Sequence, residues 1–68
     1  MKQVDEMPTS GQFVAVWQYN GKIWSGVYIN RGEWIDVYLI EDDDFERNNA
    51  ETVKNHLEKQ SAKYFIAE

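Results

Sequence analysis

The sequence predicts an α+β domain with the element order β-β-β-α-β, in which a three-stranded antiparallel meander precedes one helix and a short C-terminal strand. Three observations predict it. Residues 13–40 are rich in β-branched and aromatic side chains interrupted by turn residues. Apolar residues at helical spacing follow in residues 48–60, and residues 62–67 return to strand composition. With 68 residues the chain makes one domain. We expect residues 1–11 to be a flexible leader and residues 12–68 to be the folded part.

Two turns define the meander. Residues 13–19 have strand composition and are followed by Asn20-Gly21, a dipeptide that favours a type I′ hairpin because both residues accept a positive φ. Residues 22–29 form the second predicted strand. The next turn is predicted as the three-residue loop Asn30-Arg31-Gly32, with its glycine in the left-handed position of a bulge. The third strand is then residues 33–40.

The helix is predicted from a start signal and an apolar stripe. Asn48 is the expected N-cap and Glu51 the N3 residue of a capping box, and the helix should end near Gln60. An alternative start at Asp43 or Asp44 would place acidic residues at the positive end of the helix dipole. The apolar stripe consists of Ala50, Val53 and Leu57.

Strand register decides which way the aromatic side chains face. Around Asn20-Gly21, Trp17 opposes Trp24, and across the three-residue loop Trp24 opposes Tyr38. One face then carries Asp36 and the aromatic residues Phe13, Trp17, Tyr19, Trp24, Tyr28, Trp34 and Tyr38. The other carries the aliphatic residues Val14, Val16, Ile23, Val27, Ile29, Ile35, Val37 and Leu39. This separation favours the three-residue loop.

Only one of these faces has a predicted cover. The helix stripe is small and aliphatic, so we expect it to pack on the aliphatic face, with Phe65 extending that core. The aromatic face is then predicted to be an interface, because Trp and Tyr carry much of the energy of protein interfaces and soluble monomers rarely expose so large an apolar patch. The alternative is a sheet that curls into a small barrel around the aromatics, with a bend at Gly26 and the helix outside or at one end.

Composition and charge exclude several classes. The chain has 12 acidic and 7 basic residues, for a formal charge of −5, which disfavours binding to nucleic acid or anionic lipid. The absence of cysteine excludes disulfides, thiolate zinc sites and cysteine nucleophiles. No apolar run reaches the roughly 20 residues of a membrane span, and residues 1–11 lack the apolar region of a signal peptide. We therefore expect a cytoplasmic protein.

An acidic run follows the meander and consists of Glu41, Asp42, Asp43, Asp44 and Glu46. Carboxylates can bind a divalent cation, but the spacing is not that of an EF-hand loop. A solvated loop before the helix is the favoured interpretation, and we expect no metal and no cofactor. The same residues could imitate the phosphates of DNA, so a DNA-mimic inhibitor of a nucleic-acid-binding host protein is the alternative function.

No residue is predicted to be catalytic. His56 is the only histidine and has no nucleophile or orienting acid at a recognisable spacing. Single-stranded nucleic-acid platforms also expose aromatic residues, but they add basic ones, and the meander contains only Lys22 and Arg31. Asp36 needs a partner if it lies among aromatics. Lys22, the hydroxyl of Tyr28 or a basic group of another protein are candidates, unless Asp36 is simply exposed at an edge.

The stretch TSGQFVAVW, residues 9–17, continued by YNGKIWS, residues 19–25, resembles small hypothetical proteins encoded by tailed bacteriophages. The resemblance contains no catalytic motif and transfers no site residue. It implies an accessory protein that binds a host or phage protein in the host cytoplasm, for example to inhibit a host defence.

The sequence thus predicts a small, acidic, non-enzymatic protein-binding module that acts as an inhibitor or accessory factor. The acidic run is expected to adjust specificity. A protein or a second copy of the chain is the expected partner, with no nucleic acid and no membrane bound directly. The predicted contact residues are Trp17, Trp24, Tyr28, Trp34, Asp36 and Tyr38.

Overall fold

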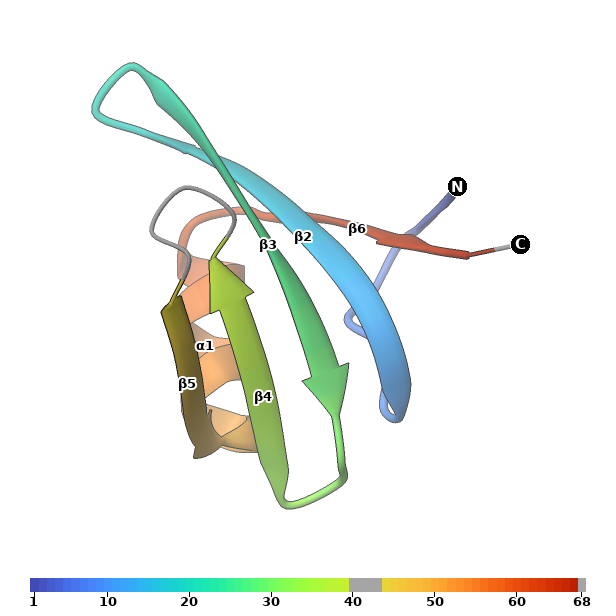
Figure 1. Ribbon diagram of the computed structural model, residues 1–68. Coiled ribbons are helices and arrows are strands. Elements are labelled where there is room, and N and C mark those ends of the chain that lie inside the picture. The colour runs from blue at the N-terminus through green and yellow to red at the C-terminus, as the bar shows by residue number, and fades with distance from the viewer. Residues whose placement is uncertain (40–43, 68) are drawn as a thin grey trace.

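The protein is described by a computed structural model that places residues 1–39 and 44–67 (Figure 1). The elements are β1 (Lys2–Val4), β2 (Gly11–Tyr19), β3 (Lys22–Asn30), β4 (Trp34–Leu39), β5 (Asp44–Asn49), α1 (Ala50–Lys59) and β6 (Lys63–Ile66). Within the described ranges, six strands form one antiparallel sheet in the order β1-β6-β2-β3-β4-β5. The predicted α+β class and single helix are confirmed, but the predicted number of strands was too small.

Two strands were missed because neither has strand composition. β1 lies in the expected leader and pairs with β6, so that Val4 opposes Tyr64. β5 replaces part of the expected acidic loop and pairs with β4, so that Phe45 opposes Tyr38. Pairing with a neighbour, rather than local propensity, holds both segments extended. A helix start at Asp44 is therefore wrong, and Asp43 lies outside the described residues.

The first hairpin is confirmed residue by residue. Asn20 and Gly21 have φ of 53° and 75°, as a type I′ turn requires. Trp17 opposes Trp24, and Phe13 opposes Tyr28.

The second turn lies further along the chain than predicted. Asn30 belongs to β3 and opposes Ile35, so residues 31–33 make the connection, closed by the Arg31 amide donating to the Trp34 carbonyl over 2.8 Å. The buried Asn30 side chain donates to the Pro8 carbonyl over 2.9 Å, and its Oδ1 accepts from the Gly32 amide over 2.8 Å. These contacts keep Asn30 in the strand. Gly32 has the expected positive φ, at 98°.

This change reverses the faces of β4. Tyr28 opposes Val37 instead of Trp34, a shift of three residues, and an odd shift moves every side chain of the strand to the other face. The single aromatic face is therefore wrong. The inner face, which α1 covers, carries Phe13, Ala15, Trp17, Trp24, Tyr28, Ile35, Val37 and Tyr64. The outer face carries Val14, Val16, Ile23, Val27, Ile29, Trp34, Asp36, Tyr38, Phe45, Arg47, Lys63 and Phe65.

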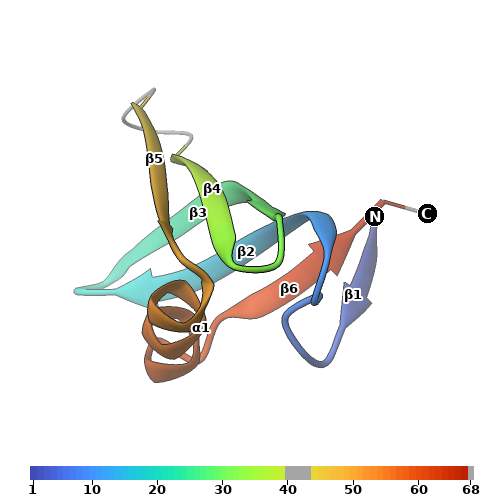
Figure 2. The same cartoon turned by 90° about the horizontal axis from the view of Figure 1, so that it is seen from below.

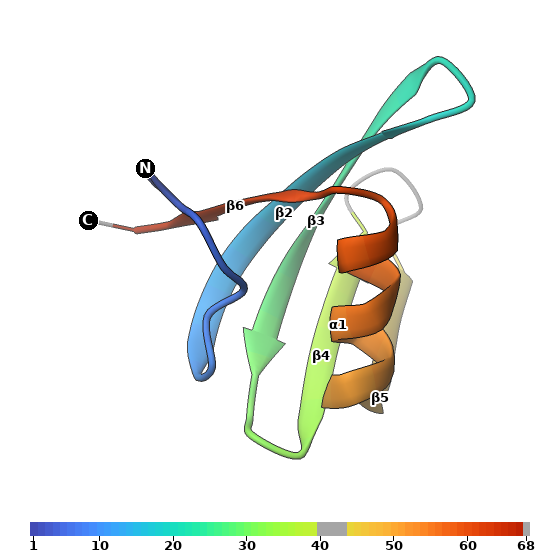
Figure 3. The same cartoon turned by 180° about the vertical axis from the view of Figure 1, so that it is seen from behind.

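The helix packs on the inner face, not on an aliphatic one as predicted. Figures 2 and 3 show α1 against one side of the strongly twisted sheet. Its buried residues, Val53 and Leu57, join a core with the aromatic rings of Phe13, Tyr28 and Tyr64. The helix encloses these rings, whereas the barrel alternative expected the sheet to close around the aromatic residues with the helix outside or at one end. Phe65 lies opposite Val14 on the outer face and does not extend this core.

The helix begins one residue later than predicted. Asn49, not Asn48, is the N-cap, and its Oδ1 accepts from the amides of Glu51 over 2.9 Å and Thr52 over 3.3 Å. Asn48 cannot cap the helix because it remains paired in β5. The end at Gln60 and the strand β6 are confirmed. Among the residues placed by the structure, no helix has the length and apolar character needed to cross a membrane.

Candidate functional site

The structure divides the predicted contact residues between two faces. Trp17, Trp24 and Tyr28 point to the inner face, where Tyr28 is buried with only 3% of its surface exposed. Trp34 and Tyr38 point to the outer face, and Asp36 lies between them on the same strand. The two groups therefore have to be considered as separate surfaces.

The outer group forms a patch together with three residues that were not predicted as contacts, namely Phe45, Arg31 and Arg47. Trp34, Tyr38 and Phe45 expose 46%, 42% and 50% of their surfaces. The rings of Tyr38 and Phe45 lie 5.0 Å apart across the β4–β5 pair. The outer patch is defined here as these three aromatic residues together with Arg31, Asp36 and Arg47.

Asp36 is the fixed centre of the outer patch. It is only 2% exposed, although it lies on a face without a covering helix. Its Oδ2 accepts from Arg31 Nε over 2.7 Å and from Arg47 Nη2 over 3.2 Å, and its Oδ1 accepts from Arg47 Nε over 2.6 Å. The hydrogen bond from Arg47, followed by that from Arg31, lowers the pKa of Asp36 to about 2. Asp36 is therefore ionised at neutral pH and held between two cations.

The partner of Asp36 differs from the sequence candidates, Lys22 and Tyr28. Arg31 lies in the turn, as expected, but it was not considered as the partner of Asp36. Arg47 was missed because its strand was not predicted. Residues 44–49 contain one apolar residue, Phe45, so no alternation of apolar and polar residues could have predicted this strand. The carboxylate of Asp36 in turn raises the pKa of Arg47. With two arginines and one aspartate, the cluster has a formal charge of +1 within a chain of net charge −5.

The outer patch continues into an apolar surface. Val14, Val27 and Phe65 lie side by side on the neighbouring strands and are partly buried, and Ile23 is 67% exposed. The helix lies on the other side of the sheet (Figure 3). Within the described residues, no element packs over this surface.

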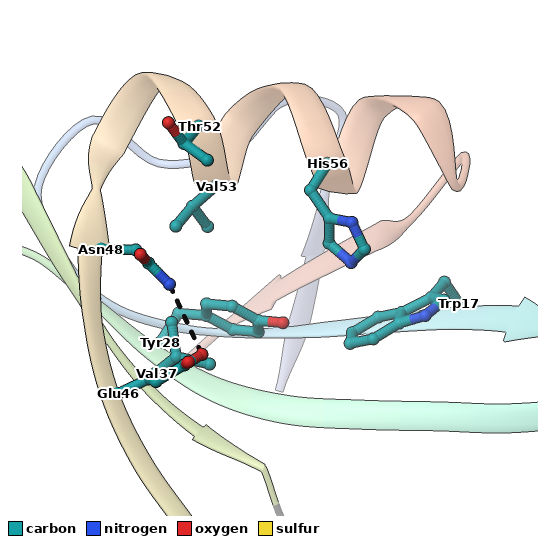
Figure 4. Close-up of a pocket in the computed structure, with 8 residues that line it drawn as sticks. All are labelled: Trp17, Tyr28, Val37, Glu46, Asn48, Thr52, Val53 and His56. Carbon is teal, nitrogen blue, oxygen red and sulfur yellow. Dashed lines mark hydrogen bonds between the residues drawn. The ribbon is translucent and has the colours of Figure 1, made fainter.

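The inner face contains a groove of about 310 Å³ beside the helix (Figure 4). The rings of Trp17 and His56 meet there edge to face, with centroids 6.0 Å apart and an interplanar angle of 85°. The Tyr28 hydroxyl points along the groove toward this pair, and burial raises the pKa of Tyr28 to about 12. The groove is lined by Trp17, Tyr28, Val37, Glu46, Asn48, Thr52, Val53 and His56.

The groove is lined by the imidazole of His56, the carboxylate of Glu46 and the phenol of Tyr28, but no described hydrogen bond connects these three groups. Its one described polar contact runs from Asn48 Nδ2 to Glu46 Oε2 over 3.4 Å. His56 instead packs on Trp17, which suits a structural role at the end of the core. In the described part of the chain, no three His, Asp or Glu side chains converge as a metal site.

The remaining predicted residues have mixed outcomes. Trp24 lies on the inner face with the Lys22 ammonium 4.5 Å from its ring centroid. Its indole N–H is buried and has no hydrogen-bond partner among the described residues. In the predicted acidic surface, Glu46 is exposed and lines the groove. Glu41, Asp42, Asp43 and the side chain of Asp44 lie outside the described residues, so the DNA-mimic hypothesis stays a prediction.

Comparison of the chain with models of protein families, with curated proteins and with solved structures finds no match. Function therefore has to be argued from the two surfaces themselves.

Proposed function

We propose that the protein is a small non-enzymatic protein-binding module that contacts its partner through the outer patch and acts as an inhibitor or accessory factor by covering the partner's surface. The observation that carries this proposal is the set of three half-exposed aromatic rings around the buried Asp36. Large side chains exposed together on a rigid sheet lose little entropy on binding, and Trp, Tyr and Arg dominate interface energetics.

A foreign protein fits this surface better than a second copy of the chain. A two-fold dimer centred on the outer patch would bring two clusters of charge +1 toward each other. A partner that combines apolar side chains with acidic ones meets both the rings and the guanidinium groups. In this proposal the protein acts in the cytoplasm, which would be that of the host cell if the phage resemblance holds.

The test compares retention of proteins from an extract of the producing cells on three immobilised forms of the chain. These are the wild type, a triple variant Trp34→Ser, Tyr38→Ser and Phe45→Ser, and the control Tyr19→Ser. Tyr19 is a matched control because it is 52% exposed but lies at the tip of the β2–β3 hairpin. We expect a protein that binds the wild type and the control and is lost with the triple variant.

Either of two further results would contradict the proposal: self-association through the outer patch, or binding of single-stranded nucleic acid to it. Sedimentation over a concentration series would reveal a dimer that the triple variant abolishes, which would make the second copy the occupant. Titration with a single-stranded oligonucleotide would quench the tryptophan emission of the wild type, but not that of the triple variant, if the outer rings stack on bases. Retention that is equal for the wild type and the triple variant would place the contact surface elsewhere.

A further inference from the structure

We infer that Arg31 and Arg47, held in place by Asp36, form a binding site for a carboxylate carried by an acidic side chain of the partner protein. This inference rests on the proposed function, since it names the chemistry that the outer patch recognises. It starts from an arrangement in which one buried carboxylate orients two arginine side chains that are 53% and 55% exposed.

Most hydrogen-bond donors of the two arginines remain unused by Asp36. A guanidinium group has five N–H donors. In the described contacts, Arg31 gives Asp36 one of them through Nε, and Arg47 gives it two through Nε and Nη2. Both side chains are about half exposed, so solvent can reach them while the bonds to Asp36 restrain their positions. A planar carboxylate is the group that such a fork binds in a bidentate manner.

Charge favours the arrival of a second anion. One aspartate between two arginines leaves the cluster with a charge of +1. The two guanidinium groups carry like charges and are held close together because both bind Asp36. A carboxylate on the solvent side restores neutrality without moving either arginine. The loss of side-chain entropy on binding is small, because Asp36 already restricts both arginines.

The surroundings select an acidic side chain over a polyanion. Trp34 and Tyr38 flank Asp36 on β4, so a ligand reaches the arginines between apolar rings. The methylene stem of Glu or Asp can pack there while its carboxylate meets the cations. A nucleic acid would instead bring many phosphates close to a chain of net charge −5, which repels them.

The experiment follows the arginine Nε–Hε resonances of the ¹⁵N-labelled protein during titration with N-acetyl-glutamate methylamide. Sodium chloride at matched ionic strength is the reference. We expect saturable shifts at Arg31 and Arg47 that chloride does not reproduce. Shifts of equal size with chloride would overturn the inference, since they would indicate only general ion binding.

Two variants distinguish a built site from simple attraction. Asp36→Asn raises the local positive charge, so general attraction predicts tighter binding of the glutamate probe. The built site predicts binding at least several-fold weaker, because the arginines lose their anchor. Arg47→Lys keeps the charge but loses the fork, and should also weaken binding several-fold. The amide spectrum shows whether each variant is folded. If Asp36→Asn does not fold, binding of the glutamate probe to Arg47→Lys alone decides between a built site and general attraction.

The inference and the proposed function can fail separately. If the partner is retained by the Arg31→Lys, Arg47→Lys double variant but lost with the Trp34, Tyr38 and Phe45 changes, the outer patch binds protein and the carboxylate site is wrong. If the glutamate probe binds but the triple variant retains every protein, the carboxylate site stands without the proposed function. Tight binding of a (dT)₁₀ oligonucleotide through both arginines, with no response to the glutamate probe, would overturn the inference in favour of a phosphate ligand.

Discussion

Both faces of the sheet carry aromatic residues in contact with each other, but these rings are buried on the inner face and half exposed on the outer face. On the inner face, Phe13 and Tyr28 stack with centroids 5.2 Å apart, and Tyr64 meets Phe13 edge to face at 6.1 Å, all under the helix. On the outer face, Tyr38 and Phe45 contact each other just as closely, at 5.0 Å, yet remain about half exposed. Aromatic content alone therefore does not reveal an interface, because strand register decides which rings are left for a partner.

The division also follows from the size of the domain. A chain of 68 residues without cysteine can bury only about 60% of its unfolded surface, so its stability depends on a few large side chains. Phe13, Tyr28 and Tyr64 supply the aromatic side chains of the hydrophobic core. Trp34, Tyr38 and Phe45 lie outside this core, and this is why we propose that they contact a partner.

The largest expected effect is the loss of a core ring. Phe13→Ala should lower the free energy of unfolding by about 3–5 kcal/mol, as for other buried aromatic residues changed to alanine. Phe13 is 1% exposed. Since a chain of this length has a total stability of roughly 3–10 kcal/mol, much of the variant should be unfolded. Urea denaturation followed by circular dichroism measures the change.

The same substitution on the outer face is the matched control. Phe45→Ala should lower the free energy of unfolding by only about 0.5–1.5 kcal/mol, the range for losing an aromatic pair such as that with Tyr38. Comparable losses of unfolding free energy for Phe13→Ala and Phe45→Ala would contradict the division between an inner face that stabilises the fold and an outer face left for the proposed partner.

Local signals explain which parts of the fold could be predicted. The first hairpin follows from Asn20-Gly21, whose backbone preference acts within two residues. The second turn depends on the hydrogen bond from Asn30 to Pro8, 22 positions away in the chain. No periodicity encodes that contact, so residues 30–32 were assigned to the loop and every side chain of β4 was placed on the wrong face.

The same error in register explains why only part of the candidate site was predicted. Trp34, Asp36 and Tyr38 were correctly expected to share one face, because alternation within a strand is local. Grouping them with Trp17 and Trp24 required the long-range register and was wrong. Arg47 joins the site only through pairing between β4 and β5, and the polar composition of β5 gave no strand signal.

An alkaline titration tests burial on the inner face. Burial raises the pKa of Tyr28 from 10.0 to about 12, so between these pH values the unfolded chain loses this proton while the folded chain keeps it. Stability should therefore fall as pH rises from 10 to 12, by on the order of 1–2 kcal/mol after allowance for solvent screening. Thermal unfolding of wild type and Tyr28→Phe across this range measures it.

The variant should show a shallower alkaline loss than the wild type. Some loss should remain, because burial also raises the pKa of Tyr64. Identical pH profiles for the two proteins would mean that the Tyr28 phenol is solvated in the groove, which would make the inner face less closed than the core packing implies.

A smaller effect tests the start of the helix that covers the inner face. Asn49→Ala removes the acceptor of the Glu51 and Thr52 amides and should cost about 1 kcal/mol of stability. Asn48→Ala is the matched control one residue earlier, where only a 3.4 Å contact with Glu46 is lost. Chemical denaturation of both variants compares the two positions. A larger loss at Asn48 would restore it as the N-cap and shorten β5.

The smallest expected effect lies at the centre of the outer patch, where the ion pairs are partly screened by solvent. Hydrogen bonds from Arg47 and Arg31 lower the pKa of Asp36 from 3.8 to about 2, so its contribution to stability is present above pH 3.8 and is lost as pH falls toward 2. The thermal midpoint of the wild type should therefore exceed that of Asp36→Asn at pH 6, and this difference should shrink between pH 4 and pH 2. Comparing the two proteins at each pH cancels the titration of the other carboxylates. A difference that stays constant down to pH 2 would mean that the guanidinium groups do not depend on the charge of Asp36, and the outer face would then lack the fixed cationic centre that sets it apart from the inner one.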